Sequence, residues 1–302
     1  MITAFRISDA LRCMLVDAPG GANLAAPIES VVRCRPLRNS TLWRQALTRD
    51  SNRVTVGDWK GMKLSSLASA RVRSGVRAWE VDRLHLQESD QALDLLEQVV
   101  RGAGFRGAER VFLRVPSDSQ IVDVARRAGF FPYYEELHLT GSEWLPGADH
   151  VSEDTAARFT AEDRSAVDRQ GLFQLYCAAT PQRVREGVGV TAGQWWDSQE
   201  PARTRRNETV LKHDGKIVGW RMREPFGKTA AGQMMGHPGH PETSEYLVRT
   251  SYQTQNWLVP DYQENIAQLL LRRGLHEAGR YTMLIKTVAV PVGNRELSYA
   301  EA

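Results

Sequence analysis

Two carboxylates on one predicted strand are the first candidates for chemistry in this sequence. Residues 78–86 (AWEVDRLHL) alternate as a β-strand does, which places Glu80 and Asp82 on one face and His85 on the other. A carboxylate in such a position can accept a proton from a substrate. A solvated strand edge would carry the same residues, so both interpretations stay open.

His237 and His240 lie close enough in the sequence to suggest a metal site. Two histidines need at least a third ligand and supporting hydrogen bonds, and the sequence offers no such cluster around them. The intervening Pro238 and Gly239 are typical of a turn that leads into a helix. We therefore predict a turn at this place and no metal cofactor.

The composition is that of an ordinary globular protein with two domains. Of the 302 residues 42% are hydrophobic and 25% are charged, and the formal net charge is +3. This charge is too small to favour a nucleic-acid partner. The 3 cysteines are far apart, which argues against a disulfide framework and favours a reducing compartment. No stretch has the length of a signal-peptide core or a membrane span, so we expect a cytoplasmic protein without a membrane partner.

A strand–helix–strand unit occurs twice, and the rest of the chain is arranged around it. The first copy spans 110–139 and its helix ends at Gly129, while the second spans 257–290 and its helix ends at Gly274. The two glycines are about 145 residues apart, which is one domain length. A whole domain is therefore predicted to be duplicated.

Each copy follows further predicted strands and a helix. In the first half, strands and then a helix are expected at 54–59, 64–75, 78–86 and 88–104. In the second half, the strongest signal is a hairpin at 208–224 with an Asp214-Gly215 turn. The predicted domain limits are an N-terminal domain 1–140, a linker 141–152, a C-terminal domain 153–290 and a tail 291–302.

The repeated unit resembles the C-terminal half of the GCN5-related N-acetyltransferase (GNAT) fold, in which a helix ends in Gly-Phe before the next strand. Gly129-Phe130 carries this signature, and the elements upstream follow the order that the GNAT fold requires. The resemblance covers both halves and implies an α/β protein with a mixed sheet, built as two tandem GNAT-like domains. It also implies the transfer of an acyl group, with acetyl as the first expectation, from acyl-CoA to a small amine, and it is compatible with a homodimer.

GNAT enzymes hold the CoA diphosphate in a loop of pattern Q/R-x-x-G-x-G/A, with backbone N–H groups at a helix N-terminus. In the first half Gln87 and Ala92 fit this pattern, but Asp90 replaces the central glycine; in the second half Glu242 takes that place. Both acids would repel a diphosphate, and both are also ordinary residues of a first helical turn. The cofactor-binding residues that the resemblance implies are Leu84, Leu86, Gln87, Ser89, Asp90, Gln91 and Ala92.

The resemblance further implies an acid and a base. The tyrosine that often protonates the leaving thiolate is replaced by Ala125 and Leu270, so we expect slow turnover, and the acids in the diphosphate loops lead us to expect weak binding of acetyl-CoA. Glu80 and Asp82 are the implied general bases of the first half, whereas the equivalent strand of the second half offers Gln233 and no carboxylate. We therefore rank the first half above the second as the acyl-CoA site.

Two further alternatives stay open. The pair Trp195-Trp196 and the basic cluster Arg203, Arg205 and Arg206 could line a substrate cleft or hold CoA phosphates, or they could be ordinary core and surface residues. The alternative function is a non-catalytic tandem module that binds a metabolite or a protein partner after loss of the diphosphate loop.

Overall fold

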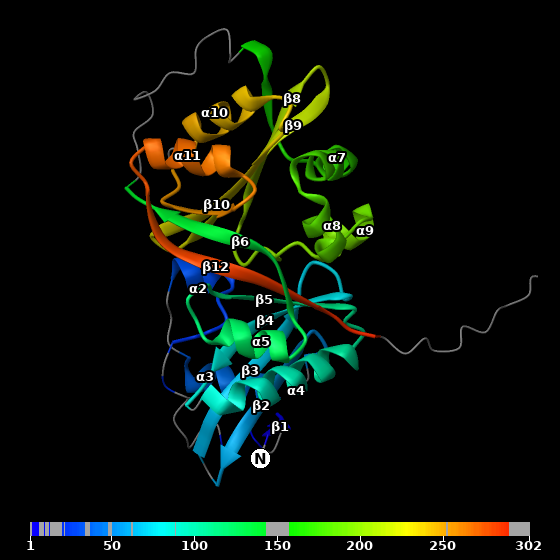
Figure 1. Cartoon of the computed structure of the whole chain (residues 1–302), viewed down its shortest axis with the longest axis vertical. Helices are drawn as coiled ribbons and strands as arrows, with labels where there is room; N and C mark the ends of the chain where they lie inside the picture. Colours follow the sequence, from blue (N-terminus) through cyan, green and yellow to red (C-terminus); the bar gives the residue numbers. More distant parts are fainter. Residues whose placement is uncertain are drawn as a thin grey trace, which may run out of the picture.

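The computed structural model describes residues 2–5, 9, 12, 20, 22–33, 37–47, 50–61, 63–87, 89–142, 157–251 and 253–289. The strands in this part of the chain form one sheet of 12 strands in the order β1-β2-β3-β4-β5-β12-β6-β11-β10-β9-β8-β7. Helices cover both faces of the sheet along the length of the molecule (Figure 1). The predicted α/β class with a mixed sheet is confirmed.

The first half follows the predicted order of strands and helices. Its elements are β1 (Ile2–Ala4), α2 (Ile28–Val32), α3 (Asn39–Leu47), β2 (Arg53–Lys60), β3 (Lys63–Val72), β4 (Ala78–His85), the 3₁₀ turn η1 (Ser89–Gln91), α4 (Ala92–Gly104), β5 (Arg110–Pro116), α5 (Ile121–Arg127) and β6 (Phe131–Thr140). The amphipathic spacing that predicts a helix at 88–104 produces α4, whose apolar side packs on β2 and β3.

The second half repeats this plan with longer connecting helices at its start. Its elements are β7 (Thr160–Asp163), the 3₁₀ turn η2 (Ala166–Asp168), α7 (Arg169–Ala179), α8 (Gln182–Val188), α9 (Ala192–Asp197), β8 (Asn207–His213), β9 (Lys216–Phe226), β10 (Thr229–Gly236), α10 (Pro241–Arg249), β11 (Asn256–Pro260), α11 (Glu264–Arg272) and β12 (His276–Thr287).

Four residues confirm the turns that the sequence predicts. Asp214 and Gly215 have φ values of 49° and 73°, so both adopt the left-handed conformation that a tight hairpin between β8 and β9 requires. Gly129 and Gly274 have φ values of 83° and 88° after α5 and α11. A left-handed residue at this position ends a helix, and glycine adopts it without steric cost.

The last strand of each repeated unit is inserted into the other unit. β12 lies between β5 and β6, where Leu284 pairs with Leu113 on one side and Pro132 on the other. β6 in turn lies between β12 and β11, and its Leu137 pairs with Val259. The two halves therefore exchange β6 and β12, and the backbone hydrogen bonds of one continuous sheet join them.

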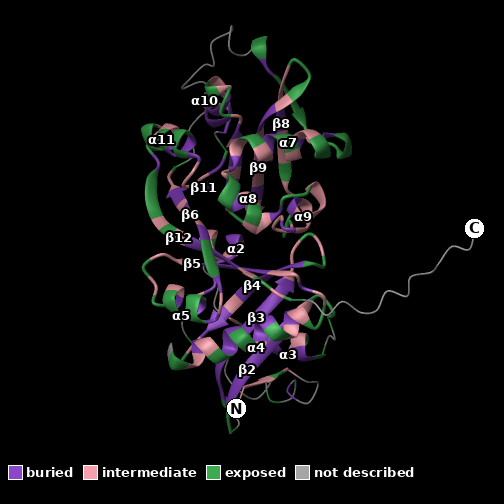
Figure 2. Cartoon of the chain, turned by 45° about the vertical axis from the view of Figure 1, so that its right-hand side comes forward, coloured by how far each residue is buried: buried purple, intermediate pink, exposed green. Residues whose placement is uncertain are grey.

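The exchange also joins the two hydrophobic cores. Leu284 of β12 is fully buried in the first-half core, which α4 and α5 cover. Leu139 of β6 is fully buried in the second-half core, which α10 and α11 cover. Figure 2 shows the central strands as buried and the outer sides of these helices as exposed. Each core is therefore completed by a residue of the other half.

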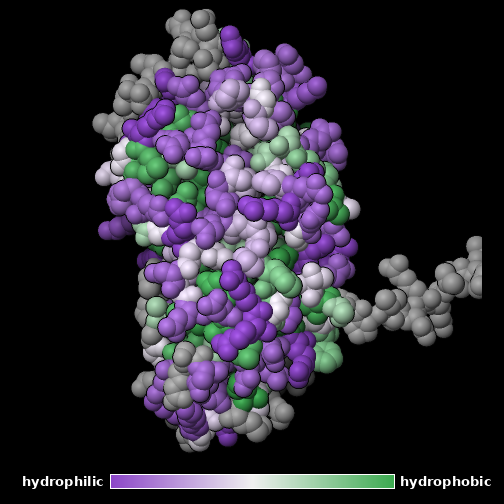
Figure 3. Space-filling view, viewed as in Figure 1, coloured by the Kyte–Doolittle hydropathy of each residue, from purple (hydrophilic) through white to green (hydrophobic). Residues whose placement is uncertain are grey.

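The face seen in Figure 3 is mostly hydrophilic, with hydrophobic residues in small separate groups. Within the described residues, none of the helices has the length and apolar character needed to cross a membrane. Most of the predicted linker 141–152 and the tail 291–302 lie outside the described residues, and the domain limits stay a prediction.

Leu284→Ala tests whether β12 completes the first-half core. The substitution removes a fully buried side chain and should lower the free energy of unfolding by about 2–5 kcal/mol, measured by urea denaturation. Leu271→Ala on α11 is the control, because that side chain is 40% exposed and its loss should have little effect. Equal effects of the two substitutions would show that β12 does not pack as described.

Candidate functional site

Parallel strands part at two places in the sheet, one in each half. β4 and β5 pair only from Ala78 to Glu80, and β10 and β11 pair only at Ala231 and Gly232. Beyond these residues the facing N–H and C=O groups have lost their partner strand and need another one. Each gap could therefore bind an extended ligand that carries amide groups, in the way that an added strand binds a sheet edge.

The first gap is filled by the chain itself. Leu24 donates its N–H to the carbonyl of Leu84 on β4 at 2.9 Å, and Ala26 donates to the carbonyl of Arg114 on β5 at 2.9 Å. The Asn23 side chain donates to the carbonyl of Asp82 at 2.9 Å and accepts from the N–H of Leu84 at 2.8 Å. Residues 23–26 thus bridge the two strands and satisfy their open edges.

The second gap opens onto a cavity. No comparable segment of the described chain bonds to the backbone of residues 233–236 on the β11 side. A cavity of about 150 Å³ lies beside this edge, between the sheet and the helices α7, α8 and α9. Its aromatic lining consists of Tyr133, Tyr134, Tyr176, Trp195, Trp196, Trp220 and Tyr262. Burial raises the pKa of Tyr262, so this phenol stays neutral.

Two carboxylates with little solvent exposure line this cavity. Glu136 comes from β6, and Glu200 comes from the loop between α9 and β8. Arg114 lies between them, with guanidinium nitrogens 2.9 Å from Glu136 and 2.6 Å from Glu200. Arg114 lies on β5, so an arginine of the first half forms ion pairs with both carboxylates that line the cavity of the second half.

The environments of these two carboxylates push their pKa values in opposite directions. Burial raises the pKa of Glu136, and Arg114 does not fully offset this effect. Burial also acts on Glu200, but the positive charges of Arg114 and Arg73 outweigh it and lower the pKa of Glu200 to about 2. A pair separated in this way is typical of sites where one acid handles protons and the other stays ionised.

The comparisons with known proteins agree with this architecture. No protein-family model matches the sequence, and no curated protein matches it. The structure is similar to that of a GCN5-related N-acetyltransferase from Sphaerobacter thermophilus, with a TM-score of 0.54, 14% identity and coverage of 95% of both chains. A proposed acetyltransferase from Pyrococcus horikoshii gives a TM-score of 0.51 and 8% identity, over 96% of this chain and 90% of that one.

The chain has the GNAT fold. The matches cover both halves, and the repeated topology described above makes it a tandem arrangement, as the sequence predicts. A tandem GNAT protein from the clavulanic acid biosynthesis pathway has a TM-score of 0.49 and 13% identity, over 95% of this chain and 98% of that one, a likeness too weak to argue from.

The predicted cofactor residues of the first GNAT unit lie around the filled gap. Leu84 and Ala92 are fully buried in the core, and Leu86 packs against it. The N–H of Gln87 donates to the hydroxyl of Ser66 at 3.1 Å, and the side chain of Gln91 donates to Asp58 at 3.0 Å. Asp90 is exposed, and Ser89 begins η1. These contacts tie the loop to β2 and β3, so its role in holding CoA stays a prediction without support from the geometry.

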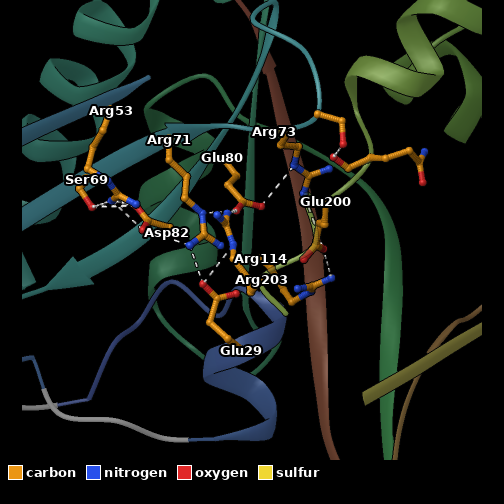
Figure 4. Close-up of polar contacts among 12 residues, drawn as sticks. Glu29, Arg53, Ser69, Arg71, Arg73, Glu80, Asp82, Arg114, Glu200 and Arg203 are labelled. Atoms are coloured by element: carbon orange, nitrogen blue, oxygen red, sulfur yellow. Dashed lines mark hydrogen bonds and ion pairs between the residues drawn. The ribbon is translucent and has the colours of Figure 1, made fainter. Parts of the chain in front are cut away.

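The predicted general bases lie in a buried ion-pair network (Figure 4). Glu80 contacts Arg71 at 2.5 Å, Arg73 at 3.3 Å and Arg203 at 3.3 Å. This network reaches from β3 and β4 to the loop before β8, so Glu80 links the two halves. Neither the first gap nor the cavity includes Glu80, and the contacts favour a structural role.

Asp82 also lies among buried charged and polar partners. It contacts Arg53 at 2.8 Å and accepts a hydrogen bond from Ser69 at 2.7 Å. Burial by itself would raise the pKa of Asp82, but the charges of Arg53 and Arg71 hold it well below its usual range. A carboxylate with so low a pKa is a weak proton acceptor, so these contacts argue against the predicted role as a base.

Sequence reasoning did not single out Glu136 and Glu200, and its ranking of the first half above the second stays a prediction. Glu136 sits in an ordinary amphipathic strand, and no local pattern shows that this strand crosses into the other half.

The described residues contain no group of three or more His, Cys, Asp and Glu side chains that could hold a metal. His237 and His240 lie in the predicted turn before α10, with a His240 N–H to His237 carbonyl distance of 3.0 Å.

Asp82→Asn tests the structural role. It removes the charge that Arg53 and Arg71 face, and breaking a buried ion pair from one side costs about 3–5 kcal/mol of unfolding free energy. Because the pKa of Asp82 is lowered on folding, its contribution is full above the unfolded value of about 3.9 and declines as the pH falls below that value.

Urea denaturation of both proteins at neutral and acid pH makes this measurement. The difference between wild type and Asp82→Asn should be large at pH 7 and should shrink below pH of about 4. Asp123→Asn, at a side chain that is 81% exposed, is the control. An unchanged unfolding free energy together with a large loss of acyl transfer would instead support Asp82 as the base.

Proposed function

We propose that the chain is an acyl-CoA-dependent N-acyltransferase whose working site is the second gap and its cavity. The observation that carries this proposal is the contrast between the gaps, since residues 23–26 fill the first whereas the second borders an open cavity. Acetyl-CoA is the donor that we expect first, and a small amine is the expected acceptor. A cytoplasmic location and a homodimer remain predictions.

The open edge of β10 would hold the arm of the acyl donor. The pantetheine part of CoA is an extended chain with amide groups, so it can pair with backbone groups of residues 233–236 as Leu24 and Ala26 pair in the first gap. Gln233 and Met235 line the cavity next to this edge. A thioester at the end of the arm would then face the cavity, which brings donor and acceptor together.

The loop after β10 gives the diphosphate little support. Pro238 and Pro241 have no N–H group, and the N–H of Gly239 donates to the ring of His237 at 3.0 Å. Glu242 adds a negative charge in the first turn of α10. We therefore expect affinity for acetyl-CoA to come mainly from the arm and to be weak.

A non-catalytic binding module is the second candidate function, and this loop favours it. Such a module would use the same cavity for a metabolite and would need no acyl donor. The two functions differ in one property that can be measured directly, because only the acyltransferase must bind acyl-CoA in the second gap.

Met235→Trp distinguishes the two gaps. The larger side chain enters the cavity beside β10 and should weaken acetyl-CoA binding in calorimetry by about tenfold or more, which is a loss of about 1.4 kcal/mol. Gln87→Trp, at the exposed mouth of the first-half loop, is the matched control and should leave the affinity unchanged.

A loss of acetyl-CoA affinity in Gln87→Trp, with the affinity of Met235→Trp unchanged, would instead place the site in the first half. If acetyl-CoA bound to none of the three proteins, the acyltransferase proposal would fail and the non-catalytic module would be the better account.

A further inference from the structure

The size and lining of the second-half cavity fit one aromatic ring. Its volume is about 150 Å³, and an apolar cavity of about this size holds one benzene-sized molecule. Tyr176 and Trp195 stack with ring centres 5.1 Å apart on one wall. Tyr134 and Tyr262 meet edge to face at 5.5 Å on another. Aromatic walls of this kind favour a flat apolar ligand over a flexible polar one.

The cations at the cavity are already paired. Arg73 donates to the carbonyl of Ser198 at 2.6 Å and lies 3.3 Å from Glu80. Arg206 lies 2.8 Å from Glu224. Arg114 donates to Glu200 at 2.6 Å, as described above. An anionic ligand would therefore have to compete with a buried carboxylate or carbonyl for each of these guanidinium groups.

The carboxylates, in contrast, keep oxygens without a donor. Among the described residues, Oε2 of Glu136 and Oε2 of Glu200 are buried and have no hydrogen-bond partner. Oε2 of Glu136 lies 2.9 Å from Nε of Arg114 in an ion pair, although the N–H of that nitrogen is directed at the sulfur of Met283 at 3.2 Å, so the carboxylate oxygen that is fully open is Oε2 of Glu200. The hydroxyl of Tyr176 is also buried without a partner. A buried acceptor without a donor is costly, so a ligand that brings an N–H donor to these oxygens would be favoured.

A protonated primary amine supplies this missing group. An ammonium has three N–H donors and a positive charge, which suit the open oxygen of Glu200, the hydroxyl of Tyr176 and the carboxylate of Glu136 beside Arg114. Among the described residues, the indole N–H of Trp196 and Nε of Arg73 are buried N–H groups of this lining without a hydrogen-bond partner, and either could bind an oxygen of the ligand or of the acyl group.

We propose that the cavity is the acceptor site for a small primary amine that carries one aromatic ring, and that Glu136 receives the proton of its ammonium group. This rests on the acyl transfer proposed above and names the acceptor class and the base. Glu136 takes one proton from the ammonium, and the freed nitrogen lone pair forms a C–N bond with the thioester carbonyl carbon. The C–S bond breaks and the thiolate takes the second proton from nitrogen. The products are an amide, a thiol and a protonated Glu136.

The surroundings favour Glu136 over Glu200 for this step. Glu136 faces Arg114 on β5, Arg73 after β3, Glu200 on the same guanidinium of Arg114, and the neutral phenols of its own strand and of Tyr262. Burial dominates among these influences and makes Glu136 the stronger proton acceptor. Glu200, beside Arg114 and Arg73, stays ionised and serves to bind the positive charge.

The test uses phenethylamine as the probe and the tryptophans of the cavity as reporters. Titration of the full chain, without an acyl donor, should change the fluorescence of Trp195, Trp196 and Trp220 and give saturable binding. The anion 3-phenylpropanoate, which has the same ring and a similar length, should bind at least about tenfold more weakly because the free acceptors repel it.

Matched variants assign the interaction to Glu136. Glu136→Gln should weaken phenethylamine binding about tenfold or more, since the charged partner is lost. Glu135→Gln is the control, because this neighbouring side chain is 42% exposed and pairs with Arg280. Glu200→Gln, a second variant, should also weaken binding. If Glu136→Gln fails to fold, the preference of the wild type for the amine over the anion and the effect of Glu200→Gln still decide the question.

The outcomes separate this inference from the proposed function. Preferential, Glu136-dependent binding of phenethylamine supports the amine site whether or not acetyl-CoA binds. Equal binding of amine and anion, or an amine affinity that Glu136→Gln and Glu200→Gln leave unchanged, overturns it. Acetyl-CoA binding in the second gap together with no amine binding would retain the acyltransferase and reject this acceptor.

Discussion

The structure depends on one constraint, the need of every central strand for hydrogen-bonded neighbours on both edges. β5 is the second strand of the parallel pair β4–β5, and β11 is the second strand of the parallel pair β10–β11. Neither is hydrogen-bonded to the next strand of its own unit, which is β6 after β5 and β12 after β11. β12 covers β5 and β6 covers β11, so each half supplies the neighbour that the other requires. The two halves therefore form one sheet, and a cavity of one half receives side chains from the other.

The same constraint explains why two copies of one fold differ. Where β4 and β5 part, the free backbone groups are bonded to Leu24, Ala26 and the side chain of Asn23. Where β10 and β11 part, the free edge borders a cavity lined by the carboxylates of Glu136 and Glu200. One copy satisfies its gap with its own chain, and in the other the edge of β10 stays open beside the cavity. The network around Glu80 and Asp82 then reinforces the closed copy and ties it to the loop before β8.

Much of the fold could be predicted because its signals are local. The glycines after α5 and α11, the Asp214-Gly215 turn and the amphipathic α4 each leave a pattern within a few residues. The exchange of β6 and β12 leaves none, because alternation shows that a segment is a strand and says nothing about its neighbour. The filling of the first gap by residues 23–26 is likewise a long-range event without periodicity.

The candidate site was harder to predict than the fold for the same reason. Glu80 and Asp82 look like proton acceptors until the arginines that neutralise them, Arg53 and Arg71, are placed beside them. Glu136 looks like an ordinary strand residue until β6 is placed next to β11. The surroundings of these carboxylates depend on which strands are adjacent in the sheet. A single sequence gives little information about the adjacency of strands that lie far apart in the chain.

Hydrogen–deuterium exchange with and without saturating acetyl-CoA tests the central claim most directly. The backbone groups of β10 next to the open gap should gain protection when the donor arm bonds to them, so peptides covering residues 233–249 should exchange more slowly. Peptides covering residues 84–96 should not change, because residues 23–26 already occupy that gap. Protection of 84–96 without protection of 233–249 would contradict the account and place the site in the first half.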